Sequence, residues 1–303
     1  MFRTTSLRTH VVALGLIGVT VSGCGGTSLA ADDEPAITPV HVSSSSQIEL
    51  PVARYASSAA DDKAIFAAVN LAQKACATKF GVDASVPVTT QPTQMDLDTA
   101  RRYGVVNPAE VARYGYLTPP SAQDADDSKA TGWNPSPLEA EVISGHSADG
   151  HSSALKARDG SRLPQGGCGG YGFQQVWGGK VPPAGNDLVE QILADAWSKT
   201  LTDSRALSAA ASWSSCMGKH GYHFQHRWDA GNSVQGKSQD VQTSMAKLDL
   251  SCARKTGYID TWYAVDTAYQ LRLIDEHKGE LEAAVKQHDD ETRRARAILQ
   301  AGM

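Results

Sequence analysis

The histidines are the residues of this chain whose type and spacing best suit metal binding. Neutral imidazole is a common ligand of zinc, copper and nickel, and a spacing of three residues places side chains on one face of a helix. The candidate ligands are His220, His223 and His226, which have that spacing, and His146 and His151, which lie in an earlier loop. Gly221 predicts that the helix ends at about His220. We therefore expect ordinary turn and surface histidines and no cofactor, with a histidine-based metal site as the alternative.

Four cysteines could form structural disulfides, while a fifth, Cys24, lies near the N-terminus. Cys216 and Cys252 each close an apolar helical stripe within residues 202–256, so two antiparallel helices could bring their sulfurs together. Of the three connectivities that four cysteines allow, we expect Cys216 with Cys252 and Cys76 with Cys168. Four free thiols are the alternative. The first bridge would close a 36-residue loop and contribute roughly 3–4 kcal/mol.

Motifs for catalysis are lacking, so no catalytic residues are predicted. The chain has no G-x-S-x-G sequence, and neighbouring carboxylates such as Asp289 and Asp290 fit a solvated helix face. The glycine-rich stretch 166–172 lacks the lysine of a phosphate-binding loop, and we expect a flexible approach to Cys168. A hydrolase without a recognisable motif remains an alternative. Six aromatic residues could line a sugar- or peptide-binding groove, although core packing is expected: Trp213, Trp228, Trp262, Tyr222, Tyr258 and Tyr263.

The first 24 residues have the pattern of an export signal. Two arginines, Arg3 and Arg8, precede an apolar run over residues 11–21, which is too short to cross a bilayer as a helix. The sequence Val21-Ser22-Gly23-Cys24 resembles a bacterial lipobox. We therefore expect a signal peptide at 1–23 and a lipid on Cys24 that anchors the protein at the extracytoplasmic face of the cell membrane. An ordinary cleaved signal is the alternative.

The charge balance disfavours nucleic acid as a partner. The formal net charge of −5 becomes −7 when Arg3 and Arg8 leave with the signal peptide. The expected partners are the membrane, through the lipid on Cys24, and an envelope protein or cell-wall component.

The rest of the sequence predicts an all-α fold with extended Pro/Gly-rich loops. Residues 24–57 have no sustained apolar period and predict a disordered tether. Residues 58–303 predict a single, mainly helical extracytoplasmic domain, with a first helix at about 59–80 and a short one at 137–144 inside a long loop, 118–167. This loop is a candidate ligand or partner surface.

A long C-terminal helix is expected at about 258–301. Its apolar residues follow a weak heptad seam, typical of a coiled coil, and it would be roughly 65 Å long. Because this length exceeds that of a domain of this size, we expect the end of the helix to project or to pack on a partner.

The two cysteine segments carry a family resemblance. Trp213-Ser-Ser-Cys216-Met217 and Asp249-Leu-Ser-Cys252 resemble segments of a family of exported actinobacterial lipoproteins, in which a paired-cysteine hairpin precedes a long terminal helix. The resemblance covers about the last 110 residues and the lipobox, and it implies location and shape only. The resulting hypothesis is a lipid-anchored, non-enzymatic binding or scaffold module.

Overall fold

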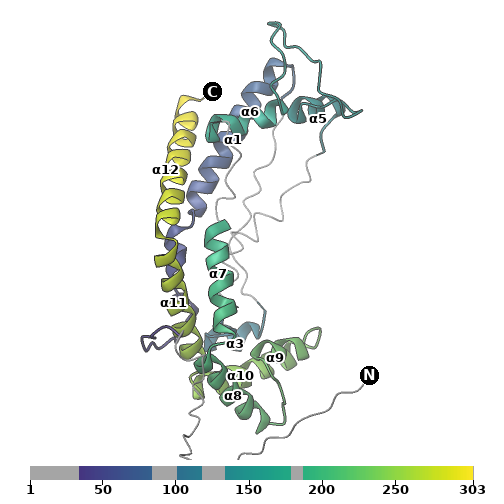
Figure 1. Cartoon of the computed structure of the whole chain (residues 1–303). Helices are drawn as coiled ribbons and strands as arrows, with labels where there is room; N and C mark the ends of the chain where they lie inside the picture. Colours follow the sequence, from purple (N-terminus) through teal and green to yellow (C-terminus); the bar gives the residue numbers. More distant parts are fainter. Residues whose placement is uncertain (1–33, 84–100, 118–133, 179–186, 303) are drawn as a thin grey trace, which may run out of the picture. The chain divides into compact units, whose positions relative to one another are not determined.

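The computed structural model describes residues 34–83, 101–117, 134–178 and 187–302 (Figure 1). The expected signal peptide, Cys24 and residues 118–133 of the long loop lie outside these ranges. Within them the regular structure is helical, and β-pairing is limited to two isolated bridges, His146 with Ser152 and Lys156 with Arg162. The prediction of a mainly helical fold is confirmed. No helix in the described ranges is long and apolar enough to cross a membrane.

The helical elements of the described ranges occur in the following order along the chain. Two 3₁₀ turns, η2 (Ser45–Gln47) and η3 (Pro51–Tyr55), come first. The α-helices are α1 (Ala59–Lys79), α3 (Pro108–Tyr114), α5 (Pro137–Ser144), α6 (Gly167–Trp177), α7 (Asp187–Thr200), α8 (Ser204–Gly218), α9 (Arg227–Ser233), α10 (Gln239–Lys255), α11 (Tyr258–Glu276) and α12 (Lys278–Ala301). The helix expected at 137–144 is thus confirmed as α5.

The main core lies where α11 packs on α7 and α8, and where α10 packs on α3, α8 and α9. Trp213 of α8 and Ile259 of α11 are almost completely buried in it. The expected hairpin is present as α8 and α10, and the connection between them contains the short helix α9. Burial of its apolar faces, rather than helix propensity, therefore holds the hairpin in place.

Both disulfides join the cysteines that the sequence pairs. Cys216 bonds to Cys252 with their Cα atoms 5.6 Å apart, and Cys76 bonds to Cys168 with a Cα separation of 5.5 Å. The first bridge staples α8 to α10, and the second joins the end of α1 to the start of α6.

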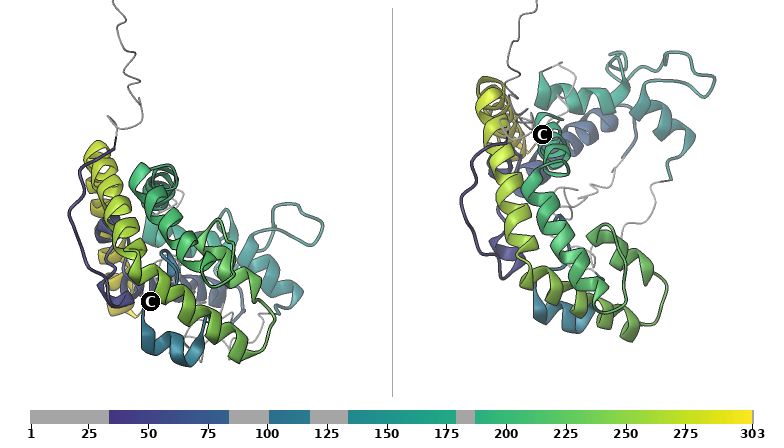
Figure 2. Two further views of the ribbon diagram at one scale, coloured as in Figure 1. Left: turned by 90° about the horizontal axis from the view of Figure 1, so that it is seen from below. Right: turned by 60° about the horizontal axis from the view of Figure 1, so that its bottom comes forward.

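The prediction of a disordered tether over residues 24–57 is wrong for residues 35–57. This segment runs alongside α11 (Figure 2), and its Val42 amide donates to Asp260 while its Val52 amide donates to Gln270. Val42 and Val52 are buried in the main core. Apolar residues that pack singly on another helix leave no period in the sequence, which is why the pattern predicted a tether.

The C-terminal helix does not project from the domain. It breaks at His277, and α12 then packs on α1 (Figure 1), where Ala295 and Ile298 are buried against Ile65 and Val69. The seam expected to form a coiled coil is therefore used within the chain. Leu271, which belongs to the same seam, stays 49 % exposed.

The glycine-rich stretch is a helix rather than a flexible approach to Cys168. A β-carbon on Gly172 would lie 2.7 Å from the carbonyl oxygen of Val69 in α1, and one on Gly169 would lie 2.9 Å from that of Ile143 in α5. Glycine costs about 1 kcal/mol in a helix relative to alanine. Here it permits a backbone approach that no other residue allows, so packing on α1 and α5 outweighs propensity.

Candidate functional site

A pocket of about 290 Å³ lies next to the stapled hairpin. Its charged lining residues are Arg101, Arg102, Arg227 and Asp249. Its aromatic lining residues are Tyr103, Tyr116, Trp197, Trp228 and Tyr258. These side chains come from the segment before α3, from the turn after α3, and from α7, α9, α10 and α11. The fold therefore brings together residues from six regions of the sequence.

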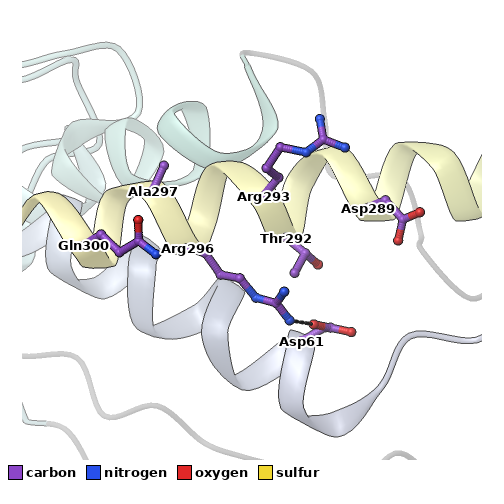
Figure 3. A pocket seen from close by; sticks show the side chains of 7 residues that line it. All are labelled: Asp61, Asp289, Thr292, Arg293, Arg296, Ala297 and Gln300. Atoms are coloured by element: carbon purple, nitrogen blue, oxygen red, sulfur yellow. Dashed lines mark hydrogen bonds and ion pairs between the residues drawn. The ribbon is translucent and has the colours of Figure 1, made fainter.

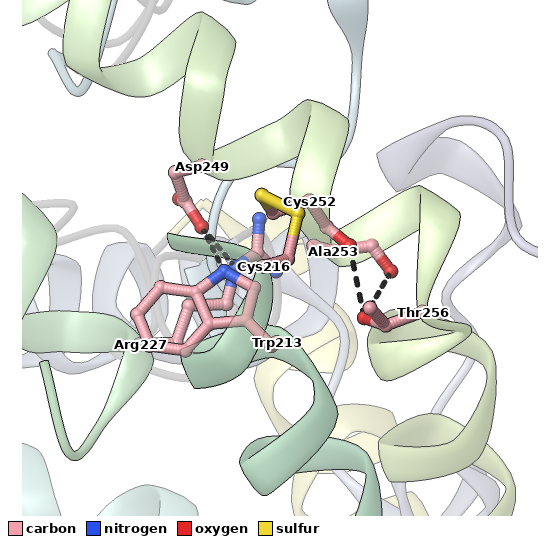
Figure 4. Close-up of a disulfide and its surroundings, with 7 residues drawn as sticks. All are labelled: Trp213, Cys216, Arg227, Asp249, Cys252, Ala253 and Thr256. Carbon is pink, nitrogen blue, oxygen red and sulfur yellow. Dashed lines mark hydrogen bonds and ion pairs between the residues drawn. A yellow bond between two sulfur atoms is a disulfide. The ribbon is translucent and has the colours of Figure 1, made fainter. Parts of the chain in front are cut away.

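A buried carboxylate, Asp249, organises the wall of the pocket beside the disulfide (Figure 4). Its Oδ1 accepts hydrogen bonds from Trp213 Nε1 at 3.0 Å and from Arg227 Nε at 2.7 Å. Its Oδ2 accepts one from the Tyr116 hydroxyl at 3.2 Å. Asp249 is only 1 % exposed, so these three donors replace the water that the carboxylate loses on folding.

Arg227 connects α9 to the segment before α3. Its terminal nitrogens donate to the carbonyl oxygens of Tyr103 and Val105, and its guanidinium lies 5.3 Å from the centre of the Tyr258 ring. Gly104 makes this approach possible: its φ is +79°, and a β-carbon there would lie 3.0 Å from the guanidinium. Arg227 is 4 % exposed and neutralised by Asp249, so its role here is to hold the pocket wall.

Arg102 forms a second internal ion pair. It donates from Nε and Nη2 to the two oxygens of Asp266, at 2.6 and 3.1 Å, and lies 4.8 Å above the Trp197 ring. Burial is the largest single influence on Arg102 and lowers its pKa, but the hydrogen bond and charge of Asp266, together with Tyr103, outweigh burial and raise the pKa. Tyr103 also donates to Asp266, at 2.5 Å, and burial followed by this carboxylate raises the pKa of Tyr103 well above its ordinary value.

Arg101 differs from the other two arginines of the lining. It donates to the carbonyl oxygen of Leu117, and within the described part of the chain it has no carboxylate at ion-pair distance. Burial lowers the pKa of Arg101, and the charge of Glu110 opposes that shift. Arg101 therefore supplies the pocket with a positive charge that the described residues only partly compensate.

The aromatic lining has both buried and open parts. Tyr258 is 3 % exposed and packs against Trp213 and Trp262, whereas Trp228 is 45 % exposed and stacks on His226 at 4.4 Å. Burial raises the pKa values of Tyr116 and Tyr258, so both phenols stay protonated at neutral pH and can donate. Tyr116 already donates to Asp249, so the pocket offers ring faces, the Tyr258 hydroxyl and a cation to a small ligand.

A second hollow, of about 460 Å³, lies between the start of α1 and the end of α12 (Figure 3). Arg296 is paired there with Asp61 at 2.7 Å, and Arg293 is paired with Asp290 at 2.9 Å. Its charges are therefore balanced within the protein. The first pocket has a more enclosed aromatic lining and an arginine without an ion-pair partner among the described residues, so it is the better candidate for a binding site.

The structure does not gather the histidines predicted as alternative metal ligands. Of His220, His223, His226, His146 and His151, none belongs to a group of three or more His, Cys, Asp or Glu side chains with metal-binding geometry in the described ranges. His226 instead stacks on Trp228, and His146 and His151 lie in an exposed turn after α5.

The six aromatic residues proposed for a groove do not gather at one place. Trp213 and Trp262 are buried in the core, as expected, and Trp228 and Tyr258 line the pocket. Tyr222 is exposed, and Tyr263 is half-buried against the core. The sequence reasoning missed Arg101, Arg102, Arg227 and Trp197. One sequence pattern could have drawn attention to Arg102 and Tyr103. In Arg102-Tyr103-Gly104, as in Arg113-Tyr114-Gly115, an arginine and a tyrosine precede a helix-ending glycine.

Comparison of the chain with protein-family models, with curated proteins and with solved structures finds no match. The candidate site therefore depends on its own geometry and charge.

Proposed function

We propose that this chain is a lipid-anchored, extracytoplasmic binding protein that holds a small molecule in the pocket beside the stapled hairpin. The observation that carries the proposal is a pocket with aromatic walls and an incompletely compensated arginine, held by two buried ion pairs and a disulfide. Ligand sites in proteins are characteristically concave and mostly apolar, with a few fixed polar groups.

The proposed location is supported by the first 24 residues and by the cysteines. A lipobox-like sequence ends at Cys24, and two disulfides fit an oxidising compartment. Packing begins at Pro35, whose carbonyl oxygen accepts a hydrogen bond from Arg205 at 2.8 Å. Only about 11 residues then separate the lipid from the folded chain, a reach of at most about 40 Å. The domain would stay close to the membrane surface.

Replacing Cys24 with alanine is expected to release the protein from the membrane, because a thioether-linked lipid would no longer form. Gly26→Ala, two residues away, is the matched control and should remain membrane-bound. The measurement is the distribution of each variant between membrane and soluble fractions, together with incorporation of labelled palmitate. Retention of Cys24→Ala in the membrane fraction would contradict lipid anchoring at this residue.

Filling the pocket from Gly231 is expected to abolish ligand binding without unfolding the protein. Gly231 lies in α9, and a β-carbon there would contact the Tyr116 ring at 3.5 Å, an ordinary van der Waals distance. Gly231→Ala should therefore fold at least as well as the wild type, since alanine favours a helix by about 1 kcal/mol. Gly231→Phe adds a ring that would occupy the pocket.

The measurement is equilibrium dialysis of the mature chain against a small-molecule extract of the cell envelope, followed by mass spectrometry. Compounds retained by the wild type and by Gly231→Ala, but lost from Gly231→Phe, support binding in the pocket. If the wild type retains nothing, or if Gly231→Phe retains the same compounds, the proposed function is wrong.

A further inference from the structure

The net charge of the pocket lining indicates the charge of the ligand. Arg227 is paired with Asp249 at 2.7 Å, and Arg102 is paired with Asp266 at 2.6 Å. Arg101 has no ion-pair partner in the described ranges. The charge of Glu110 raises the pKa of Arg101, but the two side chains are not within ion-pair distance. The lining therefore carries close to one positive charge that a ligand could neutralise.

A second group in the same pocket lacks a partner. Tyr258 is 3 % exposed and lines the pocket, yet its hydroxyl makes no hydrogen bond within the described part of the chain. The hydroxyl oxygen itself is not fully buried, so water in the pocket can reach it. An acceptor atom of a ligand could replace that water as the partner of the hydroxyl. Tyr258 therefore offers a hydrogen-bond donor to a ligand that bears an oxygen acceptor.

The remaining lining defines the body of the ligand. Trp197, Trp228 and Tyr116 present ring surfaces, and the volume of about 290 Å³ lies at the lower end of the range for ligand pockets, roughly 300–1,000 Å³. Flat apolar walls of this kind favour a single ring.

We propose that the pocket binds a small monocarboxylate with a ring-shaped body, whose carboxylate is held by Arg101 and the Tyr258 hydroxyl. The proposal rests on the proposed function and adds the chemical class of the ligand. A carboxylate accepts two parallel hydrogen bonds from a guanidinium and one more from a phenol. A phosphate dianion fits less well, because Arg102 and Arg227 are already neutralised by their own carboxylates.

Four probes test this class on the mature chain with both disulfides intact: benzoate, cyclohexanecarboxylate, benzamide and inorganic phosphate. Binding is followed by tryptophan fluorescence and by the indole N–H signals in ¹H–¹⁵N NMR, because Trp197 and Trp228 line the pocket. We expect benzoate and cyclohexanecarboxylate to bind saturably. Benzamide has the shape of benzoate without its charge and should bind at least tenfold more weakly. Phosphate should have no saturable effect.

Two substitutions assign the contacts. Arg101→Gln is expected to weaken benzoate binding roughly ten- to hundredfold, the usual effect of losing a charged hydrogen bond, and to remove the preference for benzoate over benzamide. Tyr258→Phe should weaken it about five- to tenfold. Arg113→Gln is the matched control, since Arg113 is exposed at the end of α3, and it should bind benzoate like the wild type.

The outcomes separate this inference from the proposed function. The carboxylate assignment would be overturned if benzoate and benzamide bound equally well, or if Arg101→Gln bound benzoate like the wild type. In that case, loss of both ligands from Gly231→Phe would still support a binding pocket. Preferential binding of phosphate would also overturn the carboxylate assignment. If none of the probes binds at millimolar concentration, the ligand class is wrong, whatever the envelope extract shows.

Discussion

Replacing Asp249 with alanine is expected to lower the free energy of unfolding by about 3–5 kcal/mol, the usual cost of removing one partner of a buried ion pair. Arg227 would keep its two carbonyl acceptors but lose its counter-charge at 4 % exposure. Trp213 Nε1 and the Tyr116 hydroxyl would lose their acceptor at the same time. One substitution would therefore disturb the core, the hairpin and the pocket wall together.

The measurement for Asp249→Ala is urea unfolding of the oxidised protein, followed by tryptophan fluorescence. Asp290→Ala is the matched control: it removes the partner of an exposed ion pair with Arg293 and should cost less than about 1 kcal/mol. The double variant Asp249→Leu/Arg227→Met should be more stable than Asp249→Ala, because it removes both buried charges. A change for Asp249→Ala no larger than that of the control would contradict the central role of this carboxylate.

The parts of the fold that follow from the sequence are those with a local cause. Ser136 and Pro137 mark the start of α5, where the Ser136 hydroxyl accepts from the Glu139 amide, and Gly145 in the left-handed region ends it. The cysteine pairing followed from apolar stripes on two neighbouring helices. In the first case the deciding residues lie within a few turns of one another, and in the second each stripe is local to its own helix.

The parts that could not be predicted depend on contacts between distant residues. Val42 and Val52 were predicted to be linker residues because their partners, Asp260 and Gln270, lie about 218 positions further along the chain. Helix α6 forms because Gly172 packs on Val69 of α1, a gain that propensity scales do not include. The same holds for the pocket: Arg101 becomes distinctive only once Arg102 and Arg227 are seen to have carboxylate partners.

Removing the disulfide between Cys76 and Cys168 is expected to have an effect as large as that of Asp249→Ala, but in a different part of the molecule. The bridge closes a 92-residue separation, for which the chain-entropy relation gives about 4–5 kcal/mol, compared with roughly 3–4 kcal/mol for the 36-residue separation of Cys216 and Cys252. Apart from the two cysteines, the surrounding cluster contains three buried apolar residues in the described ranges, Ala77, Val82 and Val142. The packing of Val176 in α6 on Ile65 and Val69 of α1 would remain, so the loss should be greatest near the bridge and in α5.

Hydrogen exchange of a Cys76→Ala/Cys168→Ala variant tests this local dependence. Amides of α5, α6 and the end of α1 should exchange faster, while those of α8, α10 and α11, which lie in the main core, should keep their protection. Cys216→Ala/Cys252→Ala is the matched control, and it should show the opposite distribution, with faster exchange in α8 and α10. Uniform loss of protection in both variants would instead mean that the two disulfides support one cooperative unit. In that case the pocket would depend on the distant bridge as strongly as on the adjacent one.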